Sequence, residues 1–152
     1  MKHFQTSILA SAITLLTLAS PAIRAHGDAP EAHKALHGGQ VRVAGVNNFE
    51  LVVAKVSIDA KENPLVVFVT DRAGTKMSTV GASGTATILA GKTKATVALV
   101  PDGDNRLKGT TNLGSTAEMK VVVTVALADK AKEQARFTPL AIEKSEKAGH
   151  KH

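Results

Sequence analysis

The sequence predicts an all-β protein: a single antiparallel, Ig-like β-sandwich of seven to eight strands. Beyond Gly39, apolar and polar residues alternate with a period of two, and β-branched residues are frequent. Clusters of Gly, Pro, Asp and Asn separate these runs at short intervals. No long amphipathic helical pattern lies between the runs, which favours antiparallel strands over alternating strands and helices.

The expected strands are short and follow one another through turns. They cover, in chain order, residues 40–43, 49–56, 64–71, 84–91, 93–101, 106–111, 118–128 and 135–140. Pro64 opens its strand, a position where the missing N–H does no harm. The turns are marked by "AGVNN" at 44–48, "DRAGT" at 71–75, "AGK" at 90–92 and "PDGDN" at 101–105.

The inward positions of this alternation predict the hydrophobic core. A chain of this size buries roughly two thirds of its surface on folding, which is enough for a stable core without disulfides. Met119 is also expected inside, whereas Met77 follows a turn and is expected at the surface. The candidate core residues are Val41, Val43, Leu51, Val53, Leu65, Val67, Val69, Ile88, Val97, Leu99, Leu107, Val121, Val123, Val125 and Phe137.

The first residues have the pattern of a secretory signal peptide. A basic start is followed by the apolar run "SILASAITLLTLAS" and by small residues at which a peptidase can cut, with Ala22 and Ala25 both fitting as the cleavage site. The apolar run is too short for a stable membrane span, so we expect a periplasmic protein that does not span the membrane after cleavage. The expected parts are a signal peptide, a His-bearing leader, a β domain and a polar C-terminal tail, covering residues 1–25, 26–38, 39–140 and 141–152.

Composition argues against several classes of function. The full chain carries a formal net charge of +6, but no long run of one sign, and it has only four Phe and no Trp or Tyr. This disfavours nucleic-acid binding and carbohydrate binding. The absence of cysteine excludes a thiol nucleophile and thiolate metal sites. Since "GASG" at 81–84 lacks the setting of a nucleophile elbow and "PDGDN" lacks the full ligand series of a calcium loop, we expect no enzyme and no calcium site.

The histidines are concentrated near the two ends of the chain. His26, His33 and His37 fall within the leader, and His150 and His152 close the tail. The leader has features of a short helix, on which residues four apart share one face, so His33 and His37 are placed to share one metal ion. The alternative is a solvated leader whose histidines bind nothing, and spacing alone leaves both interpretations open.

Ligand chemistry indicates which ions such a site would take. Imidazole with nearby carboxylates suits divalent transition metals, and we expect copper or zinc ahead of nickel or cobalt. His33 and His37 are the expected ligands, with His26 and Glu31 as helpers. Cleavage after Ala25 would leave His26 as a terminal chelating residue. Affinity should fall as pH drops through about 6.5, where free imidazole gains a proton.

Several segments resemble a known family. "HGGQVRVAGVNNFELVV" at 37–53, the run 64–109 and "VVVTVALADKAKEQARF" at 121–137 together resemble the small periplasmic β domain of heavy-metal efflux systems. That domain occurs alone or as the amino-terminal part of membrane-fusion adaptor subunits. The matching positions are His37, Gly38, Gly39, Glu50, Leu51 and Asp71. The sequence departs from the family at Asn48, where the family pattern would have a second histidine.

The sequence therefore predicts periplasmic binding of a divalent transition metal. The resemblance implies an accessory or sequestering protein of a heavy-metal resistance system, with an efflux complex subunit as partner. The alternative is a β-sandwich without a metal role that docks a protein partner through a sheet edge or face.

Overall fold

The computed structural model describes residues 34–55 and 62–141, and within these ranges every regular element is a strand. No helix in this part of the chain is long and apolar enough to cross a membrane. The strands are β1 (Gln40–Ala44), β2 (Asn47–Val53), β3 (Asn63–Asp71), β4 (Ser83–Ala90), β5 (Thr93–Pro101), β6 (Arg106–Thr111), β7 (Lys120–Ala126) and β8 (Lys132–Phe137).

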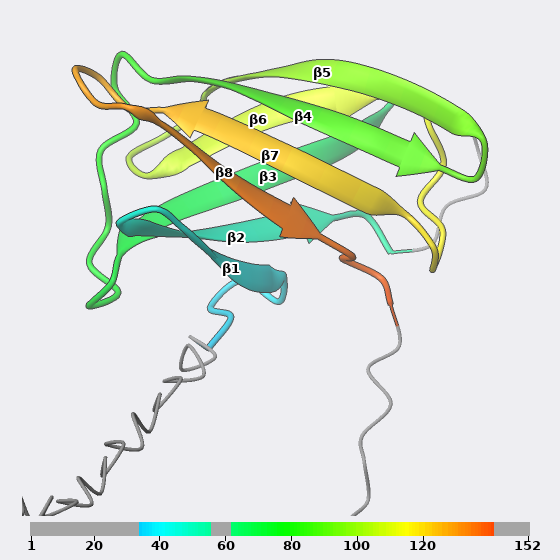
Figure 1. Cartoon of the computed structure of the whole chain (residues 1–152), viewed down its shortest axis with the longest axis horizontal. Coiled ribbons are helices and arrows are strands. Elements are labelled where there is room, and N and C mark those ends of the chain that lie inside the picture. The colour runs from blue at the N-terminus through cyan, green and yellow to red at the C-terminus, as the bar shows by residue number, and fades with distance from the viewer. Residues whose placement is uncertain (1–33, 56–61, 142–152) are drawn as a thin grey trace, which may run out of the picture.

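The eight strands form one antiparallel sheet in the order β1-β2-β3-β6-β5-β4-β7-β8. The predicted all-β, antiparallel architecture is confirmed. The strands do not separate into the two sheets of the expected sandwich, because β5 and β6 stay joined at Val100↔Lys108 and Pro101↔Leu107. Figure 1 shows the sheet curling so that β2 and β3 lie behind β7 and β8, and β1 comes to lie beside β8. The result is a nearly closed, barrel-like sheet.

Side chains, in place of a backbone ladder, hold β1 and β8 together. At one end of this seam the Glu133 carboxylate accepts hydrogen bonds from the Val46 N–H at 2.7 Å and from the Asn47 side-chain amide at 2.5 Å. At the other end the Gln40 side-chain oxygen accepts one from the Thr138 N–H at 2.8 Å. The seam therefore depends on a few polar side chains at the strand ends.

Most of the predicted core is buried inside the curled sheet. The confirmed members are Leu51, Leu65, Val67, Val69, Ile88, Leu99, Leu107, Val121, Val123, Val125 and Phe137, together with Met119. Val53 and Val97 are partly buried at the margin of the core, and Met77 also packs there although it was expected at the surface. Val41 and Val43 are half-buried because β1 lies at the seam.

The turn between β1 and β2 is tighter than the sequence predicts. It consists of Gly45 and Val46, and both Asn47 and Asn48 belong to β2, where they are buried. The expected turn at 44–48 is therefore too long at both ends, since Ala44 belongs to β1. Two asparagines usually mark a turn, but here their side-chain amides are bonded to Glu133 and to the Asp71 carbonyl, so they can stay inside a strand.

The close approach of β5 and β6 depends on Gly109. A Cβ at this position would lie 2.6 Å from Val97 Cγ1 and 2.7 Å from the Ala98 carbonyl oxygen. We predict that Gly109→Ala lowers the free energy of unfolding by about 1–3 kcal/mol, since the backbone must shift to admit the methyl group. Urea denaturation followed by far-UV circular dichroism measures this change.

Thr110→Ala is the matched control, because Thr110 is the exposed neighbour on the same strand. Its free energy of unfolding should stay within about 0.5 kcal/mol of the parent value. Equal stability of the Gly109→Ala variant and the parent protein would contradict the close packing of β5 on β6.

Candidate functional site

The carboxylate of Glu50 organises the chain segment that enters the sheet. Glu50 lies on β2 with a side chain only 8% exposed. Its Oε1 accepts hydrogen bonds from the N–H groups of His37 at 2.7 Å and Gly39 at 3.0 Å. Its Oε2 accepts from the Leu36 N–H at 3.1 Å and lies 2.9 Å from His37 Nδ1. One side chain thus holds residues 36–39 against β2.

These hydrogen bonds also determine the state of the carboxyl group. Burial by itself raises the pKa of Glu50, but hydrogen bonds from the His37 ring and from the backbone of Gly39, His37 and Leu36 lower it more. The net result is a pKa below the usual value of about 4.5. Glu50 is therefore ionised at neutral pH and acts as an acceptor for all four donors.

The imidazole of His37 is held in one orientation. The ring stacks on Phe68 of β3, with ring centroids 3.5 Å apart and planes 2° from parallel. Its Nδ1 faces the ionised Glu50, which can only accept, so in the neutral ring Nδ1 carries the proton. Nε2 then keeps its lone pair, and the side chain is 37% exposed. The geometry thus fixes the direction of the Nε2 lone pair on a partly exposed ring.

The two glycines after His37 allow this approach. Gly38 has φ +76°, in the left-handed region that favours glycine. A Cβ on Gly39 would overlap the carbonyl oxygen of Leu51. Residues 36–39 form bends, so the described end of the leader is not helical. The expected short helix is absent from 34–38, and its remaining residues, 26–33, lie outside the described part of the chain.

A cavity of about 180 Å³ opens beside the His37 ring. Its walls come from residues 34–37, from β1, β2 and β3, and from the turn after β3: Lys34, Leu36, His37, Val41, Asn48, Glu50, Phe68, Thr70 and Gly74. Asn48 is 2% exposed and donates its side-chain N–H to the Asp71 carbonyl at 2.8 Å. Its Oδ1 is buried with no hydrogen-bond partner among the described residues. A buried acceptor left without a donor costs free energy, so this oxygen is an unfavourable feature of the described structure.

Only part of the predicted metal site can be placed. His37 lies in the site, whereas His26, Glu31 and His33 lie outside the described residues, as do His150 and His152. Residues 34–55 and 62–141 hold no group of three or more His, Cys, Asp or Glu side chains able to bind a metal ion. The described part therefore contributes one imidazole donor and its supporting carboxylate.

Sequence reasoning missed the role of Glu50 and the presence of Phe68 under the ring. From the sequence, Glu50 is only a position of the family resemblance and not the group that holds the leader. A signal for it is present: a glutamate between Phe49 and Leu51, inside an otherwise apolar strand, needs buried partners.

Comparison with known proteins does not assign the chain to a family. No family model matches the chain, and neither the curated proteins nor the solved structures contain a match.

Glu50 makes the docking of residues 36–39 sensitive to acid. Because its pKa is lowered in the folded protein, the stability that it contributes is present above the unfolded value near 4.5 and is lost as pH falls through the folded value. We predict that the amide resonances of Leu36, His37 and Gly39 move together in NMR spectra below pH 4.5. In Glu50→Gln this joint acid transition should be absent.

Glu118→Gln removes an exposed carboxylate before β7 and serves as the control, which should keep the transition. Persistence of the transition in Glu50→Gln would assign it to another group and contradict this account.

Proposed function

We propose that this protein binds a divalent transition-metal ion, copper or zinc, through Nε2 of His37. The observation that carries the proposal is the pairing of His37 Nδ1 with the Glu50 carboxylate at 2.9 Å. Metal-ligating histidines almost always donate their other ring N–H to a carboxylate, a carbonyl or water, which sets the tautomer and makes the ligating nitrogen more basic. Stacking on Phe68 adds a second restraint on the ring.

The remaining ligands in this proposal come from the leader and the cavity. His33, with His26 and Glu31 as helpers, supplies the further donors that one histidine lacks. Asn48 lines the same cavity as His37, and rotation of its side chain would let the buried Oδ1 accept a hydrogen bond from a metal-bound water. Glu50 is not counted among the ligands, because its two oxygens are already engaged by four donors.

The biological setting is part of the proposal. The signal-peptide pattern of residues 1–25 supports export to the periplasm. The resemblance at 37–53 supports a role as an accessory or sequestering protein of a heavy-metal resistance system, with an efflux complex subunit as partner.

Docking of a protein along a sheet edge is less well supported. β1 and β8 are the end strands of the sheet, and they lie against each other at the seam. An incoming strand would have to displace one of them.

Isothermal titration calorimetry of the exported protein with Cu(II) and with Zn(II) tests the function. We predict saturable binding in the parent protein and its loss in the His33→Ala/His37→Ala double variant. Glu50→Gln should weaken binding by about 10–100-fold, because it removes the charged partner of the ligating ring.

Thr110→Ala, far from the leader in the sequence, is the control and should bind as the parent does. Absence of binding heat in the parent protein, or equal heats in the parent and the double variant, would overturn the proposal.

Asn48 offers a gain-of-function test. An imidazole at this position would enter the cavity that His37 lines. We predict that Asn48→His tightens Zn(II) binding by about tenfold or more, equivalent to about 1.4 kcal/mol. The gain should vanish when His37→Ala is combined with it, since both rings are required. A gain that survives without His37 would place the ion elsewhere.

A further inference from the structure

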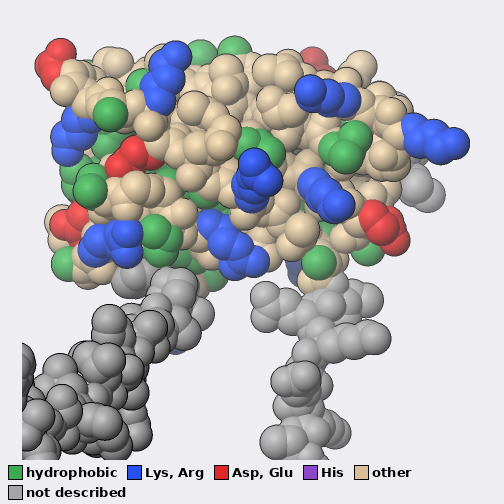
Figure 2. All heavy atoms as spheres, in the orientation of Figure 1, with side chains coloured by type: hydrophobic (Ala, Val, Ile, Leu, Met, Phe, Trp, Pro, Cys, Tyr) green, Lys and Arg blue, Asp and Glu red, His purple; other side chains and the backbone are tan. Residues whose placement is uncertain are grey.

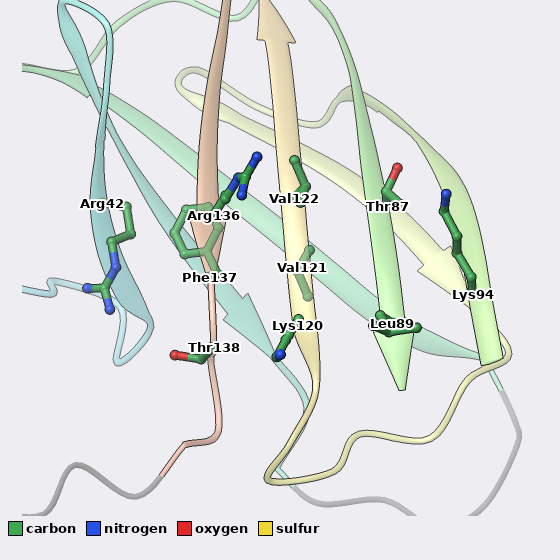
Figure 3. Close-up of a pocket in the computed structure, with 10 residues that line it drawn as sticks. All are labelled: Arg42, Thr87, Leu89, Lys94, Lys120, Val121, Val122, Arg136, Phe137 and Thr138. Carbon is green, nitrogen blue, oxygen red and sulfur yellow. The ribbon is translucent and has the colours of Figure 1, made fainter. Parts of the chain in front are cut away.

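A second and larger cavity lies on the outer surface of the sheet, away from the His37 site. It has a volume of about 580 Å³, within the range of about 300–1,000 Å³ typical of small-molecule sites. Residues from β4, β5, β7 and β8 line it, together with Thr138 after β8 and Arg42 of β1 (Figure 3). Nothing in the proposed metal function uses this cavity.

The strand register places an apolar residue between polar or charged ones at the outer face. Leu89 of β4 pairs with Lys94 of β5 on one side and with Lys120 of β7 on the other. Leu89 is 41% exposed. These three side chains form one transverse row across three strands.

The neighbouring row repeats the arrangement. Val122 of β7 pairs with Thr87 of β4 and with Arg136 of β8. Phe137 also lines the cavity, but it is almost fully buried and its ring is directed toward β1 in Figure 3. Leu89 and Val122 thus provide the accessible part of an apolar floor with cations at its edges.

The charge of the cavity has one sign. Its charged side chains are Arg42, Lys94, Lys120 and Arg136, and no Asp or Glu lines it. Among the described residues none of these four forms an ion pair, since the two pairs found there are His37–Glu50 and Arg106–Asp102. Figure 2 shows Lys and Arg side chains spread over this side of the molecule with hydrophobic side chains between them.

We infer that this cavity binds a small amphipathic anion, a carboxylate on an apolar chain such as a medium-chain fatty acid. The alkyl chain packs on the apolar floor, and the Lys and Arg side chains, which form no ion pair among the described residues, donate hydrogen bonds to the carboxylate. A cation of the same shape would be repelled, and an anion without an apolar part would leave Leu89 exposed to water. A concave site of this volume also suits a small molecule better than a flat lipid surface.

Decanoate, below its micelle concentration, is the probe. We expect saturable shifts in ¹H–¹⁵N NMR spectra of the exported protein, centred on residues 87–89, 120–122 and 136–138. Decyltrimethylammonium, which has an alkyl chain only one carbon longer and the opposite charge, should give no such shifts, and neither should acetate. Lys120→Glu/Arg136→Glu should weaken decanoate binding by about tenfold or more.

Lys76→Glu/Lys108→Glu makes the same change in charge at exposed positions outside the cavity and should bind as the parent does. Dispersed spectra of both variants will show that they are folded. Equal binding of the cationic surfactant, equal loss in the two double variants, or shifts confined to other strands would overturn the inference. Binding to anionic vesicles without saturable decanoate binding would also overturn it, in favour of a membrane surface.

Discussion

The arrangement of the site depends on the hydrogen bonds that the ionised carboxylate of Glu50 accepts from residues 36–39. A buried carboxylate is unfavourable unless hydrogen-bond donors surround it. Here residues 36–39 supply three main-chain N–H groups and the ring nitrogen of His37. The same bonds that satisfy the charge fix the path of residues 36–39 and the orientation of His37. If the leader left β2, Glu50 would lose all four of these hydrogen bonds, and water would have to replace them.

Much of the fold could be predicted from local pattern. Period-two alternation located all eight strands, because a strand with one face in the core must place apolar residues at every second position. Leu65, Val67 and Val69 on β3 are a clear case, as all three are buried. Clusters that contain glycine and proline indicated the turns. Turn positions such as Gly74 and Gly91 have positive φ, which few residue types other than glycine adopt.

The closure of the sheet and most of the site could not be read from the sequence. Strands β3 and β6 pair across a long stretch of chain, and no local signal encodes that choice or the continuity between β5 and β6. Asparagine is a residue type typical of turns, but Asn48 is buried within a strand. Its side-chain N–H donates to the Asp71 carbonyl on another strand, a partner that the local sequence does not reveal. The basic cavity combines side chains of five strands, so its charge becomes visible only when the register is known.

Strand β1 is shared by the two cavities. Val41 lines the one beside the imidazole, and the next residue, Arg42, lines the basic one, because successive side chains point to opposite faces. The strand is held on one side by its ladder to β2 and on the other by a few side-chain contacts. If both cavities bind the ligands proposed above, a displacement of the β1 backbone toward one ligand alters the geometry offered to the other. Thermodynamic linkage then requires any such influence to be mutual: whatever one occupant does to the affinity for the second, the second does equally to the affinity for the first.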